Sequence, residues 1–270
     1  MASVTFDRRR INGPEDSFSP KYEEDSLEQY GSSTSDPKLR AQDHSRNGRR
    51  PSDIRPIFLK TGLITQANGS AYIETGNTKI ACAVYGPRQS KSATYNEKGK
   101  LNVEVKFAPF SCTKRRAPMR DAEDRPVSLL IQQSLIPAVR LELIPKSTID
   151  IFLFVIENDG LEGCVSAGTT AASTALAHAK IDMLGLVVAC SAVMRLKEIW
   201  LDPTTEETSD AKGCLMLACV PALNLLTNIW QTGQMSVDEM EQCMDTCQER
   251  CVDIHSVVSQ ALLEPYSEST

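Results

Sequence analysis

Three short β-type segments follow one another between residues 62 and 87, with almost no room for connections. Asn68-Gly69 separates the first two segments, and Gly76-Asn77 separates the second and third. Asn-Gly supplies the two positive-φ positions of a type I′ turn, and Gly-Asn offers a second tight reversal. The stretch therefore predicts a three-stranded antiparallel meander.

The third segment of this meander has two unlike faces. Successive side chains in a strand point to opposite sides, so Ile80, Cys82 and Val84 share one face, while Lys79, Ala81 and Ala83 share the other. The first face is larger and more apolar, and the second is mostly small, which suits close packing. We expect later helices to cover this sheet.

Further strands are predicted by short apolar runs. Residues 101–107 alternate between apolar and polar side chains, which indicates a strand with one buried face. Residues 148–156 are apolar on both faces, which is typical of an interior strand. The runs 183–196 and 214–220 predict two more strands.

Helices are predicted where the apolar spacing changes to three or four residues. Asp121 is expected to cap a helix that Pro137 kinks and that extends to about Val139, and residues 165–179 predict a helix with small side chains. Ser236 and Glu239 form a capping-box pattern that opens a last helix to about residue 263. The order of elements predicts an α+β fold with helices packed on a mixed sheet.

Composition separates a tail from this fold. Residues 1–50 are rich in charged and small polar residues and poor in large apolar ones, so we expect a largely disordered extension before a domain over residues 51–265. No run approaches the ~20 apolar residues of a membrane span, and residues 1–10 lack the apolar region of a signal peptide. The chain is therefore expected to be intracellular and without membrane contact.

The cysteines predict neither disulfides nor a metal site. Nine cysteines form an odd set that lies mostly in apolar runs, so free buried thiols are expected. Cys243, Cys247, Cys251 and His255 repeat every four residues in the last helix. Such positions rotate by about 40° per step, so all four cannot face one tetrahedral ion, and they are interpreted as core. No metal or cofactor is predicted.

Two charged clusters are candidate sites. Lys114, Arg115, Arg116 and Arg120 form the strongest basic cluster outside the tail, and it is either a nucleic-acid contact or a solvated loop. Because the net charge is −6, any contact with nucleic acid must come from such a local patch. Four carboxylates suggest a metal or acid–base cluster, for which an exposed turn is the favoured alternative: Asp202, Glu206, Glu207 and Asp210.

Three short motifs carry a resemblance to a known family. Arg55-Pro56, Gly69-Ser70-Ala71 and Gly76-Asn77-Thr78-Lys79 resemble the opening signature of the RNase PH family of phosphorolytic exoribonucleases. The resemblance extends over about residues 50 to 263, and residues 7–16 are similar to the N-terminus of a ring subunit of the eukaryotic RNA exosome. It implies a ribosomal protein S5 domain 2-like fold, and RNA contacts by basic residues such as Lys114, Arg115, Arg116 and Arg120.

The resemblance also implies that the catalytic groups of the family are missing. Active members follow Asp-Gly with a phosphate-binding triplet such as Gly-Thr-Arg, where this chain has Leu161-Glu162-Gly163 after Asp159-Gly160. The catalytic aspartate corresponds to a position near Cys214. The Gly-Arg-Ser-Leu-Arg motif of the first helix is replaced by Gln132-Gln133-Ser134-Leu135-Ile136. No catalytic residue is therefore predicted.

These features together predict a non-catalytic RNase PH-like subunit of the exosome core ring. As the resemblance implies, it would scaffold 3′-to-5′ RNA processing and degradation and line the RNA channel. Its expected partners are other RNase PH-like ring subunits, S1/KH-domain cap subunits, an associated catalytic exoribonuclease and single-stranded RNA, in the nucleus, nucleolus and cytoplasm. The alternatives are an active phosphate-dependent 3′-to-5′ exoribonuclease and a binding module with unrelated partners.

Overall fold

The chain forms two β-sheets with helices between and beside them. The computed structural model describes residues 46, 49–90, 97–116, 123–195 and 198–267. Its strands are β1 (Ile57–Thr61), β2 (Gly69–Thr75), β3 (Thr78–Gln89), β4 (Lys100–Phe107), β5 (Ser147–Glu157), β6 (Val188–Arg195), β7 (Glu198–Leu201), β8 (Gly213–Val220) and β9 (Leu225–Gly233). Its helices are α3 (Arg125–Leu135), α4 (Leu161–His178), α5 (Thr205–Ser209) and α6 (Val237–Ser267), with short 3-10 turns at Leu141–Leu143 and Pro221–Leu223.

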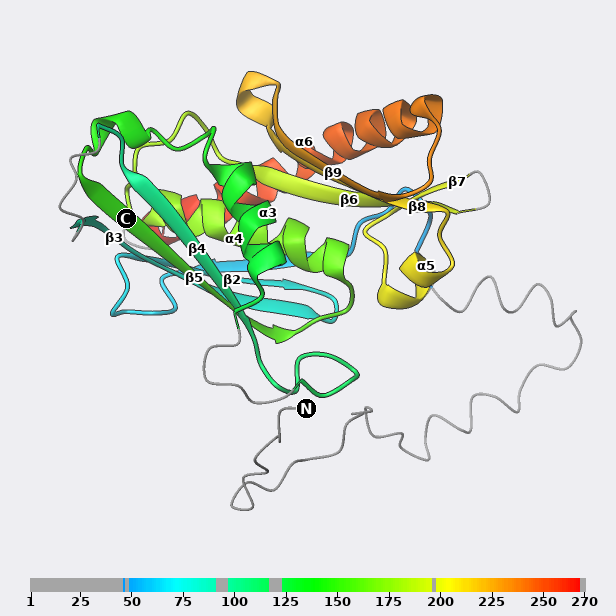
Figure 1. Cartoon of the computed structure of the whole chain (residues 1–270), viewed down its shortest axis with the longest axis horizontal. Coiled ribbons are helices and arrows are strands. Elements are labelled where there is room, and N and C mark those ends of the chain that lie inside the picture. Colours follow the sequence, from blue (N-terminus) through cyan, green and yellow to red (C-terminus); the bar gives the residue numbers. More distant parts are fainter. Residues whose placement is uncertain (1–45, 47–48, 91–96, 117–122, 196–197, 268–270) are drawn as a thin grey trace, which may run out of the picture.

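The elements stack in four layers (Figure 1). A five-stranded mixed sheet, here called sheet I, has the order β1-β2-β3-β5-β4, with only β4 and β5 parallel. A four-stranded antiparallel sheet, sheet II, has the order β7-β6-β8-β9. Helix α4 contacts β2 and β3 of sheet I and β6 and β8 of sheet II, so it lies between the sheets, and α6 contacts β6 and β8. The α+β class is confirmed, but the helices pack on two sheets instead of one.

The meander is present, but one of its two predicted turns is wrong. Gly76-Asn77 does join β2 to β3 tightly, and Gly76 has a φ of 55°. Asn68-Gly69 forms no two-residue turn, because β1 ends at Thr61 and a longer loop leads to β2. Gly69 instead lies against α4, where a Cβ would be 2.2 Å from the Ala175 carbonyl oxygen. Close approach of the helix, and not turn geometry, requires this glycine.

The first described helix is shorter than predicted. Helix α3 begins at Arg125 with Asp124 at the N-cap position, so the predicted cap Asp121 is wrong and itself lies outside the described residues. The helix ends at Leu135, before Pro137, because a proline has no backbone N–H with which to continue the helical hydrogen bonds. Val139 is buried but lies beyond the helix, in an isolated bridge with Met183.

Two strands of sheet II were not predicted. Strand β7 is only four residues long, and β9 is an edge strand in which four large apolar side chains lie exposed or partly exposed, so neither has a clear two-residue alternation. Strand β6 begins at Val188, five residues later than the predicted run from Met183. In β8 every residue is buried, which agrees with the apolar run that predicted it.

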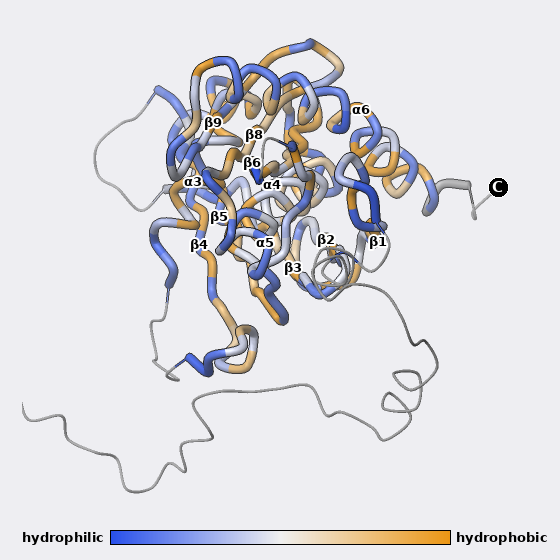
Figure 2. The backbone as a smooth tube through the Cα atoms, turned by 90° about the vertical axis from the view of Figure 1, so that its right-hand side faces the viewer, coloured by the Kyte–Doolittle hydropathy of each residue, from blue (hydrophilic) through white to orange (hydrophobic). Residues whose placement is uncertain are grey.

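Helix α6 closes the far side of sheet II. The predicted capping box is confirmed, since the Glu239 amide donates to Ser236 Oγ at 3.3 Å and the Ser236 amide donates to Glu239 Oε2 at 2.8 Å. Hydrophilic and hydrophobic residues alternate along the helix (Figure 2). Cys243, Cys247 and Cys251 are completely buried on its sheet-facing side, and all nine cysteines are free thiols.

Neither a metal cluster nor a membrane helix occurs in the described residues. No group of three or more His, Cys, Asp or Glu side chains there has a geometry that holds a metal ion. No described helix is long and apolar enough to cross a membrane. Most of the predicted extension, residues 1–50, lies outside the described residues, and its disorder stays a prediction. Arg46, which belongs to that segment, is buried against sheet II.

Candidate functional site

The N-terminus of α4 is where the sequence predicts a lost anion site. Strand β5 ends at Glu157, a short turn follows, and α4 begins with Leu161-Glu162-Gly163. The positive end of a helix dipole favours anions there, but Glu162 places a carboxylate in the first turn and is only 6% exposed. The N-terminus of α4 therefore already has the Glu162 carboxylate at the position where a phosphate would bind.

Gly163 lies against Arg55, at the position where the resemblance implies a phosphate-binding arginine in active members. A Cβ at residue 163 would lie 3.0 Å from Arg55 Nη2 and 3.8 Å from Asp202 Oδ1. A side chain there would press on the end of the Arg55 side chain, which would have to shift by a few tenths of an ångström, and a cationic side chain would also be repelled by it. An internal ion pair thus lies directly beside this position.

Cys214 lies close enough to Glu162 to feel its charge. The resemblance places the catalytic aspartate of the family near Cys214, so this closeness to the start of α4 is expected. Burial, and then the negative charge of Glu162, raise the pKa of the Cys214 thiol to about 11. The thiol is therefore protonated at neutral pH, and it is too weak an acid to protonate a leaving group. The structure brings together the two positions of the family site but gives them no acid and no cation.

The glutamines of α3 serve structural roles or face solvent. Gln132 donates from Nε2 to the Leu101 carbonyl oxygen at 2.6 Å, so it bonds the backbone of edge strand β4. Gln133 is exposed. Neither residue can supply the positive charge that the corresponding family motif carries.

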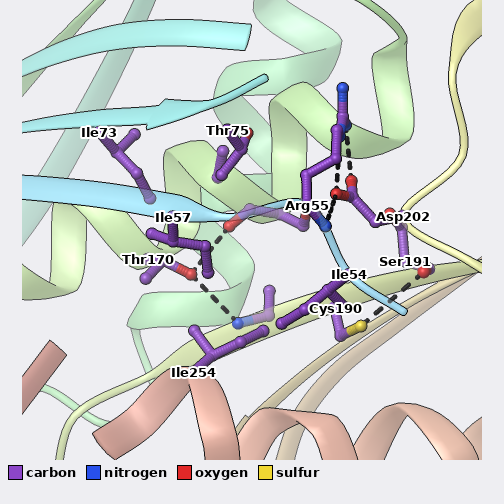
Figure 3. Close-up of a pocket in the computed structure, with 13 residues that line it drawn as sticks. Ile54, Arg55, Ile57, Ile73, Thr75, Thr170, Cys190, Ser191, Asp202 and Ile254 are labelled. Carbon is purple, nitrogen blue, oxygen red and sulfur yellow. Dashed lines mark hydrogen bonds and ion pairs between the residues drawn. The ribbon is translucent and has the colours of Figure 1, made fainter. Parts of the chain in front are cut away.

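A buried ion-pair network borders this site. Arg55 donates from Nε to Asp202 Oδ2 at 2.7 Å and from Nη2 to Asp202 Oδ1 at 2.6 Å, and Figure 3 shows the two groups facing each other. Its Nη1 reaches Asp159 Oδ2 at 3.3 Å. Burial raises the pKa of Asp159, against the opposing pull of Arg55. The network links the start of sheet I to the loop that follows β7 in sheet II.

A second buried pair was not predicted. Arg46 donates from Nε to Glu207 Oε1 at 3.0 Å, donates to the Leu201 carbonyl oxygen, and lies 4.6 Å from the centre of the Trp200 ring. Glu207 also completes a capping box with Thr204 at the start of α5. The Thr-x-x-Glu spacing was a local signal for this cap. Arg46 had no such signal, because Glu207 and Leu201, which bury it, are more than 150 residues away.

Three of the four carboxylates suspected as a metal or acid–base cluster pair with arginines. Asp202 pairs with Arg55, Glu207 with Arg46, and Asp210 Oδ2 with Arg195 Nη2 at 3.1 Å. Asp202 and Glu207 are mostly buried, so an exposed turn is wrong for these two. Glu206 is exposed and lies at the edge of an open depression of about 1060 Å³ beside α5. The depression mixes both signs of charge, which does not suit a dedicated anion pocket.

The basic cluster is divided by the structure. Lys114 and Arg115 are exposed and form no ion pair within the described part of the chain. Arg116 pairs with Asp124 at 3.0 Å, and its guanidinium lies 3.8 Å from the centre of the Phe107 ring. Arg120 lies outside the described residues. Two of the four predicted RNA contacts are therefore available on the surface, and one is held in an internal contact.

Comparisons with known proteins agree with this architecture. Residues 53–182 match the model of the 3′ exoribonuclease family, domain 1, and residues 185–250 match domain 2 of that family. The chain is 33% identical to exosome complex component mtr3 of Schizosaccharomyces pombe, over 97% of this chain and 98% of that protein. It is 34% identical to human exosome complex component MTR3, over 95% and 94% of the two chains.

Archaeal relatives and solved structures extend the comparison. Exosome complex component Rrp41 of Pyrococcus horikoshii is 37% identical over 82% of this chain and 88% of its own length. The crystal structure of rice Rrp46 superposes with a TM-score of 0.66 at 24% identity, covering 80% of this chain and 97% of that one. An Archaeoglobus fulgidus exosome chain gives a TM-score of 0.68 at 16% identity, over 81% and 94%, which shows the fold alone. With both family domains matched in order along its length, the chain belongs to the 3′ exoribonuclease (RNase PH) family.

Proposed function

We propose that the chain is a non-catalytic subunit of an exosome core ring, where it scaffolds 3′-to-5′ RNA processing and degradation and lines the RNA channel. Its near full-length similarity to mtr3 exosome components supports the assembly role. The contact of Gly163 with Arg55 is the observation that carries the catalytic part of the proposal. An arginine at that position would place a second cation in tight contact with the Arg55–Asp202 pair, which disfavours it.

The electrostatics of the site support the same conclusion. Phosphorolysis needs a pocket that attracts inorganic phosphate and a group that protonates the leaving oxygen. Glu162 repels a phosphate at about 4 Å by about 1 to 4 kcal/mol at surface-like dielectric constants. Cys214 stays neutral because its pKa is about 11. Both requirements are therefore unmet by the residues at these positions.

The decisive experiment is an assay of the purified chain with single-stranded RNA and inorganic phosphate. We expect no release of nucleoside diphosphates above that of a buffer control. An RNase PH-family enzyme of established phosphorolytic activity run in parallel checks the assay conditions. Release of nucleoside diphosphates by this chain, lost when phosphate is omitted, would show that it is an enzyme.

An active phosphate-dependent 3′-to-5′ exoribonuclease is the second candidate. It is favoured by the 37% identity to archaeal Rrp41 and by the fold shared with an exosome whose structure has RNA bound to the active site. The two candidates differ in the same assay. The variant Glu162→Thr with Gly163→Arg and Cys214→Asp restores only some of the family's groups. The cations that the family motif carries at positions 133 and 136 stay absent, so we expect this variant to be inactive as well.

The proposed partners follow from the ring role. They are other RNase PH-like subunits, S1/KH-domain cap subunits, an associated catalytic exoribonuclease and single-stranded RNA, and the proposed sites of action are the nucleus, nucleolus and cytoplasm. Affinity purification of the tagged chain with mass spectrometry should recover these subunits together. Recovery of the chain alone would contradict the ring role and favour a separate binding module. Imaging of a fluorescent fusion tests the location.

A further inference from the structure

A second depression, of about 680 Å³, lies between α3, the start of α4 and β9. Helix α3 lies against both β9 and α4 (Figure 1). The volume is within the range of about 300–1,000 Å³ that is usual for ligand pockets. Among the described residues, this depression shares only Asn158 and Leu161 with the one beside α5, so it is a separate site. Most of its lining residues are apolar: Pro126, Val127, Leu129, Leu130, Leu161 and Trp230.

One wall of the depression contains an aromatic ring whose strand is fixed in place. Asn228 of β9 donates from Nδ2 to the Leu130 carbonyl oxygen at 3.3 Å and to Ser134 Oγ at 3.2 Å. These hydrogen bonds hold β9 against α3. Trp230 is two residues further along β9, so its side chain is on the same face of the strand as Asn228. The partly exposed Trp230 ring therefore lines a site that exists before any ligand arrives.

The opposite wall is also held by contacts within the chain. Arg116 pairs with Asp124 at 3.0 Å, and its guanidinium lies 3.8 Å from the centre of the Phe107 ring. Leu129 is 45% exposed and Leu161 is 41% exposed, although both line the depression. A concave apolar site with one aromatic ring suits a flat group such as a nucleobase, which stacks between aromatic and apolar side chains.

Unpaired cations flank the depression on both of its chain segments. Lys114 and Arg115 directly precede Arg116, and Arg125 directly follows Asp124. Lys114, Arg115 and Arg125 are exposed, and none of them forms an ion pair within the part of the chain that the structure describes. Cations placed in this way can neutralise the phosphates on either side of a bound base.

The acidic groups near the depression are fewer and mostly paired or buried. Asp159 pairs with Arg55, and Glu162 is only 6% exposed. Glu123 is exposed. Strand β9 has no charged residue, and Arg125 is the only one in α3. The surroundings are therefore net positive although the whole chain has a net charge of −6, and this favours a nucleic acid over an apolar protein side chain as the ligand.

We propose that this depression, here called the Trp230 pocket, binds one base of single-stranded RNA by stacking on Trp230. Lys114, Arg115 and Arg125 contact the neighbouring phosphates. The inference rests on the proposed function, because a role in lining the RNA channel brings RNA to the chain. Since every base has a π-face, the pocket holds RNA without a strong sequence preference.

The chain has only two tryptophans, which allows a direct test on the full chain. In a Trp200→Phe background, the tryptophan emission comes from Trp230 alone. A short oligoadenylate is titrated at low salt up to millimolar concentration, and an oligomer of the same length without bases is the matched ligand. We expect the oligoadenylate to quench the emission and the abasic oligomer to leave it unchanged. Equal quenching by both ligands, or none by the oligoadenylate, would overturn the proposal.

Variants separate base stacking from general charge effects. Trp230→Leu removes the ring without adding charge, and Leu129→Glu puts a carboxylate at an exposed position of the pocket. Each should weaken the binding of labelled RNA at least about fivefold in fluorescence anisotropy. Leu143→Glu is the matched control, because Leu143 is 57% exposed in a 3-10 turn outside the pocket, and it should bind like the wild type. Thermal melting checks that each variant is folded, and wild-type affinity in both pocket variants would contradict the proposal.

A photo-crosslinking amino acid at position 129 tests whether the ligand is RNA or a neighbouring protein. In the assembled ring with bound RNA, crosslinks to RNA support the Trp230 pocket, and crosslinks only to a protein subunit contradict it. Failure of the chain to assemble with ring subunits would contradict the proposed function instead. The quenching experiment on the isolated chain would still decide the pocket, so the two failures are distinguishable.

Discussion

The central strands of sheet II are covered on both faces, whereas β5 of sheet I is covered on one. Every residue of β8 is buried, because α4 lies on one side of sheet II and α6 on the other. In β5, exposed and buried residues alternate from Ile151 to Val155, although the sequence is apolar throughout. The same sequence pattern thus has two outcomes. An apolar strand that the chain covers on both faces is core, and one that it covers on a single face leaves every second side chain exposed.

The largest expected effect concerns the link between the two sheets. Arg55→Met leaves Asp202 and Asp159 without their cation in a mostly buried site, which should destabilise the chain by about 3–5 kcal/mol. Urea denaturation measures this. Arg50→Met is the control, because Arg50 is exposed, and it should change the free energy of unfolding by less than about 0.5 kcal/mol. Equal losses in the two variants would contradict the structural role of Arg55.

The second prediction tests the two sheets directly. Leu217→Ala removes a completely buried side chain from β8 and should cost about 2–5 kcal/mol of unfolding free energy. Phe154→Ala removes a larger side chain from the open face and should cost the isolated chain less than about 1 kcal/mol. Denaturant titration of the two variants beside the wild type measures both values. A large loss for Phe154→Ala would mean that this face is covered in the free chain.

The third prediction concerns the loop that follows β4 in sheet I. Each phosphate contact with single-stranded RNA adds about 0.7 to the slope of log affinity against log salt, so Lys114→Ala with Arg115→Ala should flatten the slope by about 1.4 in the assembled ring. Arg116→Ala should leave the slope unchanged, because Arg116 is held by Asp124 and Phe107. RNA binding at several salt concentrations measures the slopes. An unchanged slope in the double variant would place the loop away from RNA.

The smallest expected effect is a pH dependence at the network between the sheets. Because burial raises the pKa of Asp159 above its unfolded value, the folded chain holds this proton more tightly than the unfolded chain. The contribution of Asp159 to stability is therefore fully present below pH 3.8 and declines as the pH rises through the raised pKa. Asp159→Asn should remove this decline. Unfolding free energies of both proteins between pH 3 and pH 7 measure it, and parallel curves would contradict the assignment.

The sequence was sufficient where local patterns decide the structure. The two-residue alternation of apolar side chains predicted β4, and the Gly76-Asn77 turn and the Ser236 capping box set the boundaries of their elements. The four-residue spacing of Cys243, Cys247 and Cys251 predicted core positions on α6 and not metal ligands, and all three are buried. The loss of the catalytic groups stays a prediction from the sequence, because it depends only on which residue types stand at the family's positions.

Tertiary structure decided what depends on contacts between distant segments. Gly69 is required by the backbone of Ala175 and not by a turn, and Arg46 finds Glu207 across 161 residues. The open face of sheet I was also beyond the sequence, since an apolar strand carries no mark of whether its cover belongs to the same chain. Local residue order determines periodicity and turns, whereas burial depends on which surfaces meet, and that is determined only when the whole chain has folded.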